Sequence, residues 1–308
     1  MTTTTLFVAH QSASGNGIWY SFLGADKIWN DYNVPIGNEI FNGPACTAFQ
    51  GMIYIAFRGN TNSDTNSNLW YMTFDGLEWK QYAVPVALET LDGPALAVYK
   101  DKLYFVFRGN ESNGSTLYYV TYDGSSWSEQ VQITGAYAFS YPAAAVYDGN
   151  LYVAFQGTSQ NSKGNLWISD YNGTIWSSVT QAQVNGLEMF DGPSILEING
   201  KLSIGFLGNG NSLWLAINDS SSGTWQPSQI IPEGGGLWAA SGPGLCQFEN
   251  TYYCFFQGGG QGLWYLQSSD GVTWTQNPIN GAYLVAQPSP ISLSVTITSN
   301  LESYNLAS

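Results

Sequence analysis

The stretch that decides the fold is Gly93–Asn110, which reads GPALAVYKDKLYFVFRGN. A proline is followed first by a short run of small apolar residues and then by the alternating segment Leu103–Phe107. Alternation with a period of two, rich in β-branched and aromatic residues, is typical of a half-buried β-strand. The stretch therefore predicts two successive short strands.

This stretch recurs along the whole chain. Related copies begin at Gly43 (GPACTAFQGMIYIAFRGN), Tyr141 (YPAAAVYDGNLYVAFQGT), Gly192 (GPSILEINGKLSIGFLGN) and Gly242 (GPGLCQFENTYYCFFQGG), and a partial copy begins at Gln287 (QPSPISLSVTITSN). The marker prolines of the copies are Pro44, Pro94, Pro142, Pro193, Pro243 and Pro288, spaced by 50, 48, 51, 50 and 45 residues. A near-constant period of this length is the signature of a repeat architecture.

Each repeat reads as four short strands. The third strand opens with an aliphatic–aromatic pair such as Leu117-Tyr118, and the fourth follows a turn such as Asp123-Gly124 and carries a tryptophan, here Trp127. Asp-Gly and Asn-Gly are the residues that type I′ hairpin turns favour, so we predict such turns between the third and fourth strands. No segment has convincing helical periodicity. Four-stranded repeats of this length predict the blades of a β-propeller.

The two ends of the chain predict how the ring closes. The N-terminus begins at a second strand, Leu6–His10, and the C-terminus supplies an unpaired first strand, 291–298. We therefore expect an all-β fold, a six-bladed propeller of four-stranded antiparallel blades, in which the C-terminal strand pairs with the N-terminal blade. Residues 1–308 form one domain in this prediction. Blade repeats start near residues 43, 93, 141, 192 and 242, and the sixth blade is shared between 287–300 and 5–36.

Composition restricts the partners. Of 308 residues, 8 are Lys or Arg and 22 are Asp or Glu, so the net charge is −14. This sign argues against nucleic acid or an anionic membrane as the main partner. The N-terminus does not read as a signal peptide and there is no apolar run long enough to span a bilayer, so we expect no membrane insertion. We expect the protein in the cytoplasm, or secreted without a signal peptide.

The cysteines and the repeated tryptophans have structural interpretations. Three cysteines are an odd number, which argues against a disulfide framework. Cys246 and Cys254 flank a predicted hairpin, and we interpret them as buried thiols while leaving a disulfide open. Six tryptophans recur once per blade and predict packing between blades: Trp29, Trp79, Trp127, Trp176, Trp225 and Trp274. The turn 268–274 resembles the Asp-box of sialidase propellers, which is a structural motif.

Three sets of positions vary between the repeats and predict a site. Because the strands run up and down, the end of strand two, the start of strand three and the connection into the next blade meet at one end. The candidates at the end of strand two are Gln11, Arg58, Arg108, Gln156 and Gln257, with Leu207 in the remaining repeat. Those that open strand three are Trp19, Trp70, Tyr118, Trp167 and Trp264. Those five residues before a marker proline are Glu39, Glu89, Tyr137, Trp238 and Tyr283.

These positions co-vary and suggest two kinds of cluster. Arg58 is grouped with Glu39 and Arg108 with Glu89, whereas each glutamine is grouped with a tyrosine or tryptophan. An aromatic ring covers the apolar face of a pyranose while Arg, Gln or Glu hydrogen-bonds its hydroxyls, so both kinds predict sugar recognition. Ion pairs in the first kind and aromatic packing at the blade boundary in the second are the structural alternatives.

The repeat unit resembles that of the tandem-repeat β-propeller lectins. The resemblance is carried by the strand of small residues after the proline, the LYxxFRG segment and the DGxxW turn. The resemblance extends over nearly the whole chain and includes the bacterial seven-bladed and the fungal six-bladed fucose-binding groups. It implies a multivalent, non-enzymatic lectin whose partners are glycans. Six blades depart from the bacterial group, and Gln or Leu replaces Arg in four repeats.

Two other function classes stay open: a propeller-fold glycoside hydrolase or lyase, and a protein-binding scaffold. His10 is the only histidine, which excludes a multi-histidine zinc site. We expect no cofactor and no metal, and we interpret the loop 60–64 as solvated. No pair of carboxylates is marked out by the repeat as catalytic.

Overall fold

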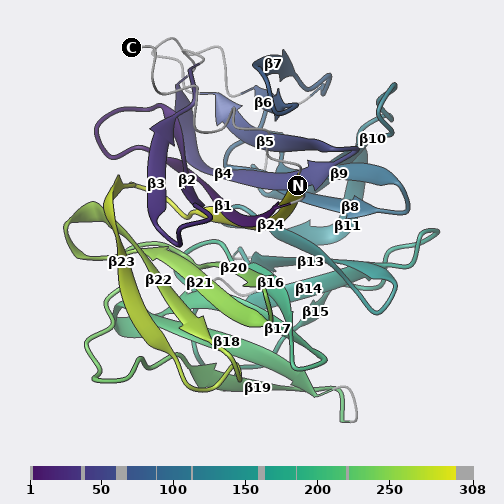
Figure 1. The fold of residues 1–308 in the computed structure, drawn as a ribbon. Helices are drawn as coiled ribbons and strands as arrows, with labels where there is room; N and C mark the ends of the chain where they lie inside the picture. Colours follow the sequence, from purple (N-terminus) through teal and green to yellow (C-terminus); the bar gives the residue numbers. More distant parts are fainter. Residues whose placement is uncertain are drawn as a thin grey trace.

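The chain forms the predicted six-bladed β-propeller (Figure 1). The computed structural model describes residues 3–35, 39–59, 68–87, 89–111, 114–158, 164–184, 186–219 and 222–295. Within them, six four-stranded antiparallel sheets are arranged in a ring, and we number these blades in chain order. The innermost strands of neighbouring blades lie side by side around a central axis.

The strands of each blade are given from the axis outward. Blade 1 contains β24 (Ser289–Val295), β1 (Thr3–Gln11), β2 (Ile18–Leu23) and β3 (Trp29–Asn33). Blade 2 contains β4 (Ile40–Phe49), β5 (Met52–Gly59), β6 (Leu69–Phe74) and β7 (Trp79–Ala83). Blade 3 contains β8 (Ala95–Tyr99), β9 (Lys102–Arg108), β10 (Thr116–Tyr122) and β11 (Val131–Tyr137).

The other three blades follow the same order. Blade 4 contains β12 (Ala143–Tyr147), β13 (Asn150–Gln156), β14 (Leu166–Tyr171) and β15 (Thr180–Gln181). Blade 5 contains β16 (Ser194–Ile198), β17 (Lys201–Gly208), β18 (Ser212–Asp219) and β19 (Thr224–Gln229). Blade 6 contains β20 (Gly244–Phe248), β21 (Thr251–Gln257), β22 (Gly262–Ser268) and β23 (Thr275–Tyr283). Two 3-10 turns, η2 (Asn209–Asn211) and η3 (Gly259–Gln261), precede β18 and β22.

The C-terminal strand closes the ring, as predicted. β24 pairs antiparallel with β1 from Thr3↔Val295 to Ala9↔Ser289. On its other side, the backbone amide of Cys46 donates to Ser289 Oγ at 2.9 Å, and Cys46 Sγ donates to the Ser289 carbonyl at 2.8 Å. Residues 296–298 of the predicted strand lie outside the described part of the chain. Pairing β24 with β1 covers a strand edge that would otherwise expose unpaired amides and carbonyls.

The turn chemistry differs from the prediction. At Asp75-Gly76 only the glycine has a positive φ, so the turn between the third and fourth strands is not type I′. Instead, Asp75 Oδ1 accepts hydrogen bonds from the amides of Leu77 and Glu78, at 2.9 and 3.0 Å. Type I′ geometry occurs between the first and second strands, where Lys100 and Asp101 both have positive φ.

The repeated tryptophans pack between blades, which confirms their predicted role. The ring centroids of Trp29 and Phe255 of blade 6 are 5.6 Å apart, and those of Trp79 and Tyr20 of blade 1 are 5.8 Å apart. Trp274 is only 2% exposed. In blades 3 and 4 the tryptophan lies before the fourth strand, in a single bridge to the third, so the prediction that Trp127 belongs to the fourth strand is wrong.

The cysteines are free and buried. Leu245, not Cys246, lies opposite Cys254 in the pairing of β20 with β21. Since successive side chains of a strand point to opposite faces, Cys246 and Cys254 lie on different faces of blade 6 and do not form a disulfide. Burial raises the pKa of the Cys46 thiol to about 12.

Candidate functional site

The connections from strand two to strand three and the connections between blades meet at one end of the propeller, as predicted. We call this end the connection face. The amide of Ile40, which begins blade 2, donates to the carbonyl of Asn16 in blade 1 at 2.6 Å. Ala138 donates in the same way to Ser115 at 2.7 Å. Met189, Ala239 and Leu284 donate likewise to Gly164, Asn211 and Gln261, so within the described residues five inter-blade connections are hydrogen-bonded to the preceding blade.

The predicted clusters are divided between the two faces of each blade. Arg58 pairs with Leu69 in the register of β5 and β6, whereas Trp70 pairs with Phe57. Because side chains alternate along a strand, the end-of-strand-two residue and the aromatic residue of the same blade face different neighbours. Arg58 and Trp70 therefore belong to two different boundaries between blades. The prediction that these residues of one blade converge within one cluster is therefore wrong, because their side chains lie on opposite faces of the blade.

The end-of-strand-two residues bind the backbone of the next blade. Gln11 Nε2 donates to the carbonyl of Ile40 at 3.0 Å, and Arg58 Nη1 donates to that of Leu91 at 3.0 Å. Two further side chains repeat the contact, Arg108 with the Phe139 carbonyl and Gln156 with that of Met189. Gln257, at the same position of blade 6, is 9% exposed. These side chains connect neighbouring blades.

The arginines also pair differently from the prediction. Arg108 Nη1 forms an ion pair with Asp92 Oδ2 at 2.5 Å, and not with Glu89. Glu89 instead accepts a hydrogen bond from Asn110 Nδ2 at 2.8 Å. Burial lowers the pKa of Arg58, and this effect is opposed by the charges of Asp92 and Glu89, which belong to the next blade. Glu39 is exposed.

One boundary holds a pocket in which two predicted residues do meet. Between blades 6 and 1, Trp19 and Tyr283 line a cavity of about 230 Å³. Its other lining residues are small or polar: Ser12, Ala13, Ser14, Asp31, Gln261 and Gly281. Tyr283 is 55% exposed, and Trp19 is half-buried. We call this cavity the blade 6–1 pocket. Gln11, predicted with them, does not line it.

A polar group that the sequence reasoning missed lies at this pocket. His10 is fully buried, and its Nε2 lies 2.9 Å from Asp31 Oδ1. Ser21 Oγ donates to the same Asp31 oxygen at 2.6 Å. Asp31 thus joins Ser21 and His10, whereas a catalytic serine triad requires histidine between the other two. The signal was present in the repeat, because the residue aligned with His10 is phenylalanine in the other five copies.

The other predicted aromatic residues lie at similar positions on the connection face. Trp70, Tyr118, Trp167 and Trp264 are half-buried, and each packs against a hydrophobic cluster. Tyr137 is half-buried at the end of β11, and its carbonyl accepts from the Thr158 amide just as that of Tyr283 accepts from Ala13. Trp238 is 49% exposed in the connection before blade 6. The repeat therefore places comparable aromatic groups at several blade boundaries.

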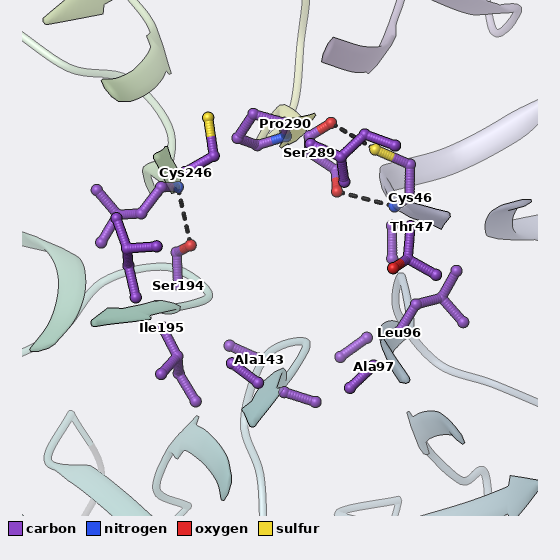
Figure 2. A pocket seen from close by; sticks show the side chains of 18 of the residues that line it. Cys46, Thr47, Leu96, Ala97, Ala143, Ser194, Ile195, Cys246, Ser289 and Pro290 are labelled. Carbon is purple, nitrogen blue, oxygen red and sulfur yellow. Dashed lines mark hydrogen bonds between the residues drawn. The ribbon is translucent and has the colours of Figure 1, made fainter. Parts of the chain in front are cut away.

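A second cavity of about 570 Å³ lies on the central axis (Figure 2). Figure 2 shows that the innermost strands line it, with small or aliphatic side chains such as Ala97, Ala143 and Ile195 around its wall. At the connection face, the glycines that precede the marker prolines approach one another closely. There Gln287 Nε2 donates to the carbonyls of Pro193 and Pro243, at 3.0 and 2.6 Å. Polar side chains also line it, among them Ser194 and Ser289, whose hydroxyl oxygens accept hydrogen bonds from the amides of Leu245 and Cys46 in neighbouring first strands.

Two carboxylates, Asp191 and Asp92, lie in the connections that precede blades 5 and 3. Burial raises the pKa of Asp191, which accepts hydrogen bonds from the amides of Gly192 and Gly242 at 2.9 and 2.7 Å. Asp92 is held by Arg108 and by Asn42 Nδ2, the latter at 2.9 Å. Both carboxylates bind protein donors, which is a structural role in holding the connections of neighbouring blades together.

The described residues contain neither a cluster suited to a metal ion nor a membrane-spanning helix. Among them, no group of three or more His, Cys, Asp or Glu side chains could hold a metal ion. The loop 60–64 lies outside the described part of the chain. In the ranges that the structure describes, no helix has the length and apolar character needed to traverse a bilayer.

Comparisons with known proteins relate the fold to two groups of propellers. No protein-family model and no curated protein sequence matches the chain. The structure is similar to the fucose-specific lectin from Aleuria aurantia, with 16% identity, a TM-score of 0.66, and coverage of 89% of this chain and 90% of that one. It is also similar to a GH43_1 enzyme from Xanthomonas citri, with 14% identity, a TM-score of 0.54, and coverage of 80% and 91%. At these low identities, the structural similarity shows a shared fold and no more.

Proposed function

We propose that the protein is a multivalent carbohydrate-binding protein without enzymatic activity. The observation that carries the proposal is the blade 6–1 pocket, where Trp19 and Tyr283 meet a rim of hydroxyl, amide and carboxylate groups. A sugar ring has an apolar C–H face and a periphery of hydroxyls. An aromatic wall with a few polar groups is the combination that binds such a ligand.

The shape of the pocket fits a single sugar unit of a larger glycan. A volume of about 230 Å³ is below the usual range for enclosed drug-sized sites, about 300–1,000 Å³, so only part of an oligosaccharide would be covered. Shallow sites of this kind bind weakly. Aromatic residues at the other boundaries, Trp70, Tyr118, Trp167 and Trp264, are the candidates for further sites, and several weak sites on one face give avidity toward a glycan-covered surface.

The structural neighbours support this proposal and also supply its main rival. One neighbour is described as a fucose-specific lectin and another as a GH43_1 enzyme. A glycosidase needs two carboxylates about 5–10 Å apart that face the substrate. Asp31 is the one carboxylate among the described residues that line the blade 6–1 pocket. The lectin function is therefore favoured over hydrolysis at this pocket.

A glycan array with the wild-type protein and Trp19→Ala tests the proposal. We expect glycan binding without release of product, and at least about a ten-fold weaker affinity for the best glycan in Trp19→Ala, because stacking on the indole is lost. Val272→Ala is the control, since this residue is 77% exposed in the turn between β22 and β23, away from the connection face. Cleavage of a bound oligosaccharide, or an array without any binding, would overturn the proposal.

A further inference from the structure

Blade 1 differs from the other blades in one row of side chains. Val8, Ser21 and Asp31 lie side by side across β1, β2 and β3, and His10 follows on the same face. At the register positions of Ser21 and Asp31, blade 2 has Met72 and Gln81, blade 5 has Ala216 and Pro227, and blade 6 has Leu266 and Gln276. Blades 2, 5 and 6 thus have no ionisable side chain at these two positions, whereas blade 1 has Asp31.

The two carboxylate oxygens of Asp31 have different surroundings, and Oδ1 accepts the hydrogen bonds from the protein. Both contacts from His10 Nε2 and Ser21 Oγ go to Oδ1. Among the described residues no donor lies within hydrogen-bonding distance of Oδ2, and the side chain, 10% exposed, reaches the cavity wall beside Trp19. The second oxygen is thus available to a ligand that lies against the indole.

The contacts of His10 indicate that Asp31 keeps its negative charge. The ring nitrogen Nδ1 is buried and has no hydrogen-bond partner among the described residues. A doubly protonated ring would bury an N–H without an acceptor, which is costly. The neutral ring with its hydrogen on Nε2 makes the observed bond to Asp31. It leaves the charge of the carboxylate uncompensated, because Asp31 is the one formally charged group among the described residues that line the pocket.

We propose that the blade 6–1 pocket selects sugars that carry a protonated amine, with the ammonium group on Asp31 Oδ2 and the apolar ring face on Trp19. This proposal rests on the proposed function and names the ligand class of one of its sites. A hydrogen bond between an ammonium group and a carboxylate is stronger than one from a neutral hydroxyl. The aromatic faces of Trp19 and Tyr283 also attract a cation. Sugars with a carboxylate would be repelled by Asp31 and by the net charge of −14.

Titration with four sugars tests the selection. Glucosamine, glucose, N-acetylglucosamine and glucuronic acid are titrated near pH 6, at low and high salt, with binding followed by the chemical shifts of the tryptophan indoles. For the wild-type protein we expect glucosamine to bind about ten-fold or more tightly than glucose. The difference should shrink at high salt because the interaction is between charges. Glucuronic acid should bind least.

Substitutions at Asp31 and His10 test whether the charge of Asp31 causes the preference for glucosamine. Asp31→Asn preserves the shape of the side chain and removes its charge, so glucosamine and glucose should then bind within about three-fold of each other. Val272→Ala should retain the preference. His10→Phe places at this position the residue that the other five copies carry. It should weaken the preference for glucosamine, because Asp31 loses its hydrogen bond from His10, which helps to hold it in place. It should not remove the preference, because Asp31 keeps its charge and its bond to Ser21.

The outcomes separate this inference from the function on which it rests. Equal or tighter binding of glucose by the wild-type protein, or a preference for glucosamine that persists in Asp31→Asn, would overturn the inference and leave carbohydrate binding intact. If the glycan array and all four sugars show no binding, both the inference and the proposed function are wrong.

Discussion

The carbonyl oxygen of Gly43 lies within 3.0 Å of the point that a Cβ atom on Gly93 would occupy. Related contacts recur between Gly192 and Gly242, so the glycine before each of these marker prolines lets neighbouring first strands approach at the axis. This explains why these copies of the repeat keep a glycine there.

Gly93→Ala should therefore destabilise the propeller. The added methyl group must displace backbone, and overpacking of this kind costs about 1–3 kcal/mol in the free energy of unfolding. Gly15→Ala is the matched control, because a Cβ atom there meets nothing within 4 Å and its φ is not positive. Urea unfolding of both variants checks the expectation, and equal midpoints would contradict it.

Deletion of residues from Ile291 onward should open the ring. It removes the β24 pairing from Thr3↔Val295 to Phe7↔Ile291 and exposes the edge of β1. We expect aggregation on expression, measured by size-exclusion chromatography and light scattering. A chain that lacks only residues 301–308 serves as the control and should stay monodisperse. A soluble, cooperatively unfolding protein without residues 291–308 would show that β24 is not needed for closure.

Replacement of Arg108 should affect stability and leave ligand binding unchanged. Its guanidinium group bonds Asp92 and the carbonyls of Gly114 and Phe139, so Arg108→Ala removes one hydrogen bond from each of these three partners. We expect a loss of about 1–3 kcal/mol in the free energy of unfolding. Lys80→Ala removes an exposed ion pair with Glu78 and should change nothing measurable. Reduced binding of the best array glycan by folded Arg108→Ala would indicate that the arginine contacts ligand.

Alkaline pH should weaken the fold through its buried tyrosines. Burial raises the pKa of Tyr20, Tyr54 and Tyr104 to about 12, from an ordinary value of 10.0. Below pH 10 the phenols are protonated in both states. Between pH 10 and 12 the unfolded chain ionises while the folded chain keeps its protons, so the free energy of unfolding falls across this range. Thermal unfolding from pH 8 to 12, combined with tyrosinate absorbance, measures this fall in stability. A constant unfolding midpoint above pH 10 would contradict the prediction.

Much of the fold follows from local features of the chain. A period near fifty residues, a proline at each blade start and short alternating segments predict six four-stranded blades, and the two incomplete ends predict closure by the last strand. These features act within hairpins, where neighbours in sequence are neighbours in space. The type of turn was harder to predict from the sequence, because Asp75-Gly76 is compatible both with type I′ and with a turn held by the aspartate carboxylate.

The candidate site was predicted only in part, because a site between blades depends on strand register. Trp19 and Tyr283 were grouped correctly from their positions in the repeat, and the structure brings them together in one pocket. Gln11 lies next to His10 in sequence but on the opposite face of the strand, bonded to blade 2. A shift of one residue along a strand exchanges its two faces.

The sequence alone determined that aromatic and polar residues would recur on one end of a closed ring, since the repeat and the direction of its strands require it. Only the tertiary structure decided which of them meet. The pairing of Arg108 with Asp92 and the group of His10, Ser21 and Asp31 beside Trp19 are contacts between separate strands. Contacts of this kind depend on how strands are paired and blades are packed, and a pattern along one strand does not contain that information.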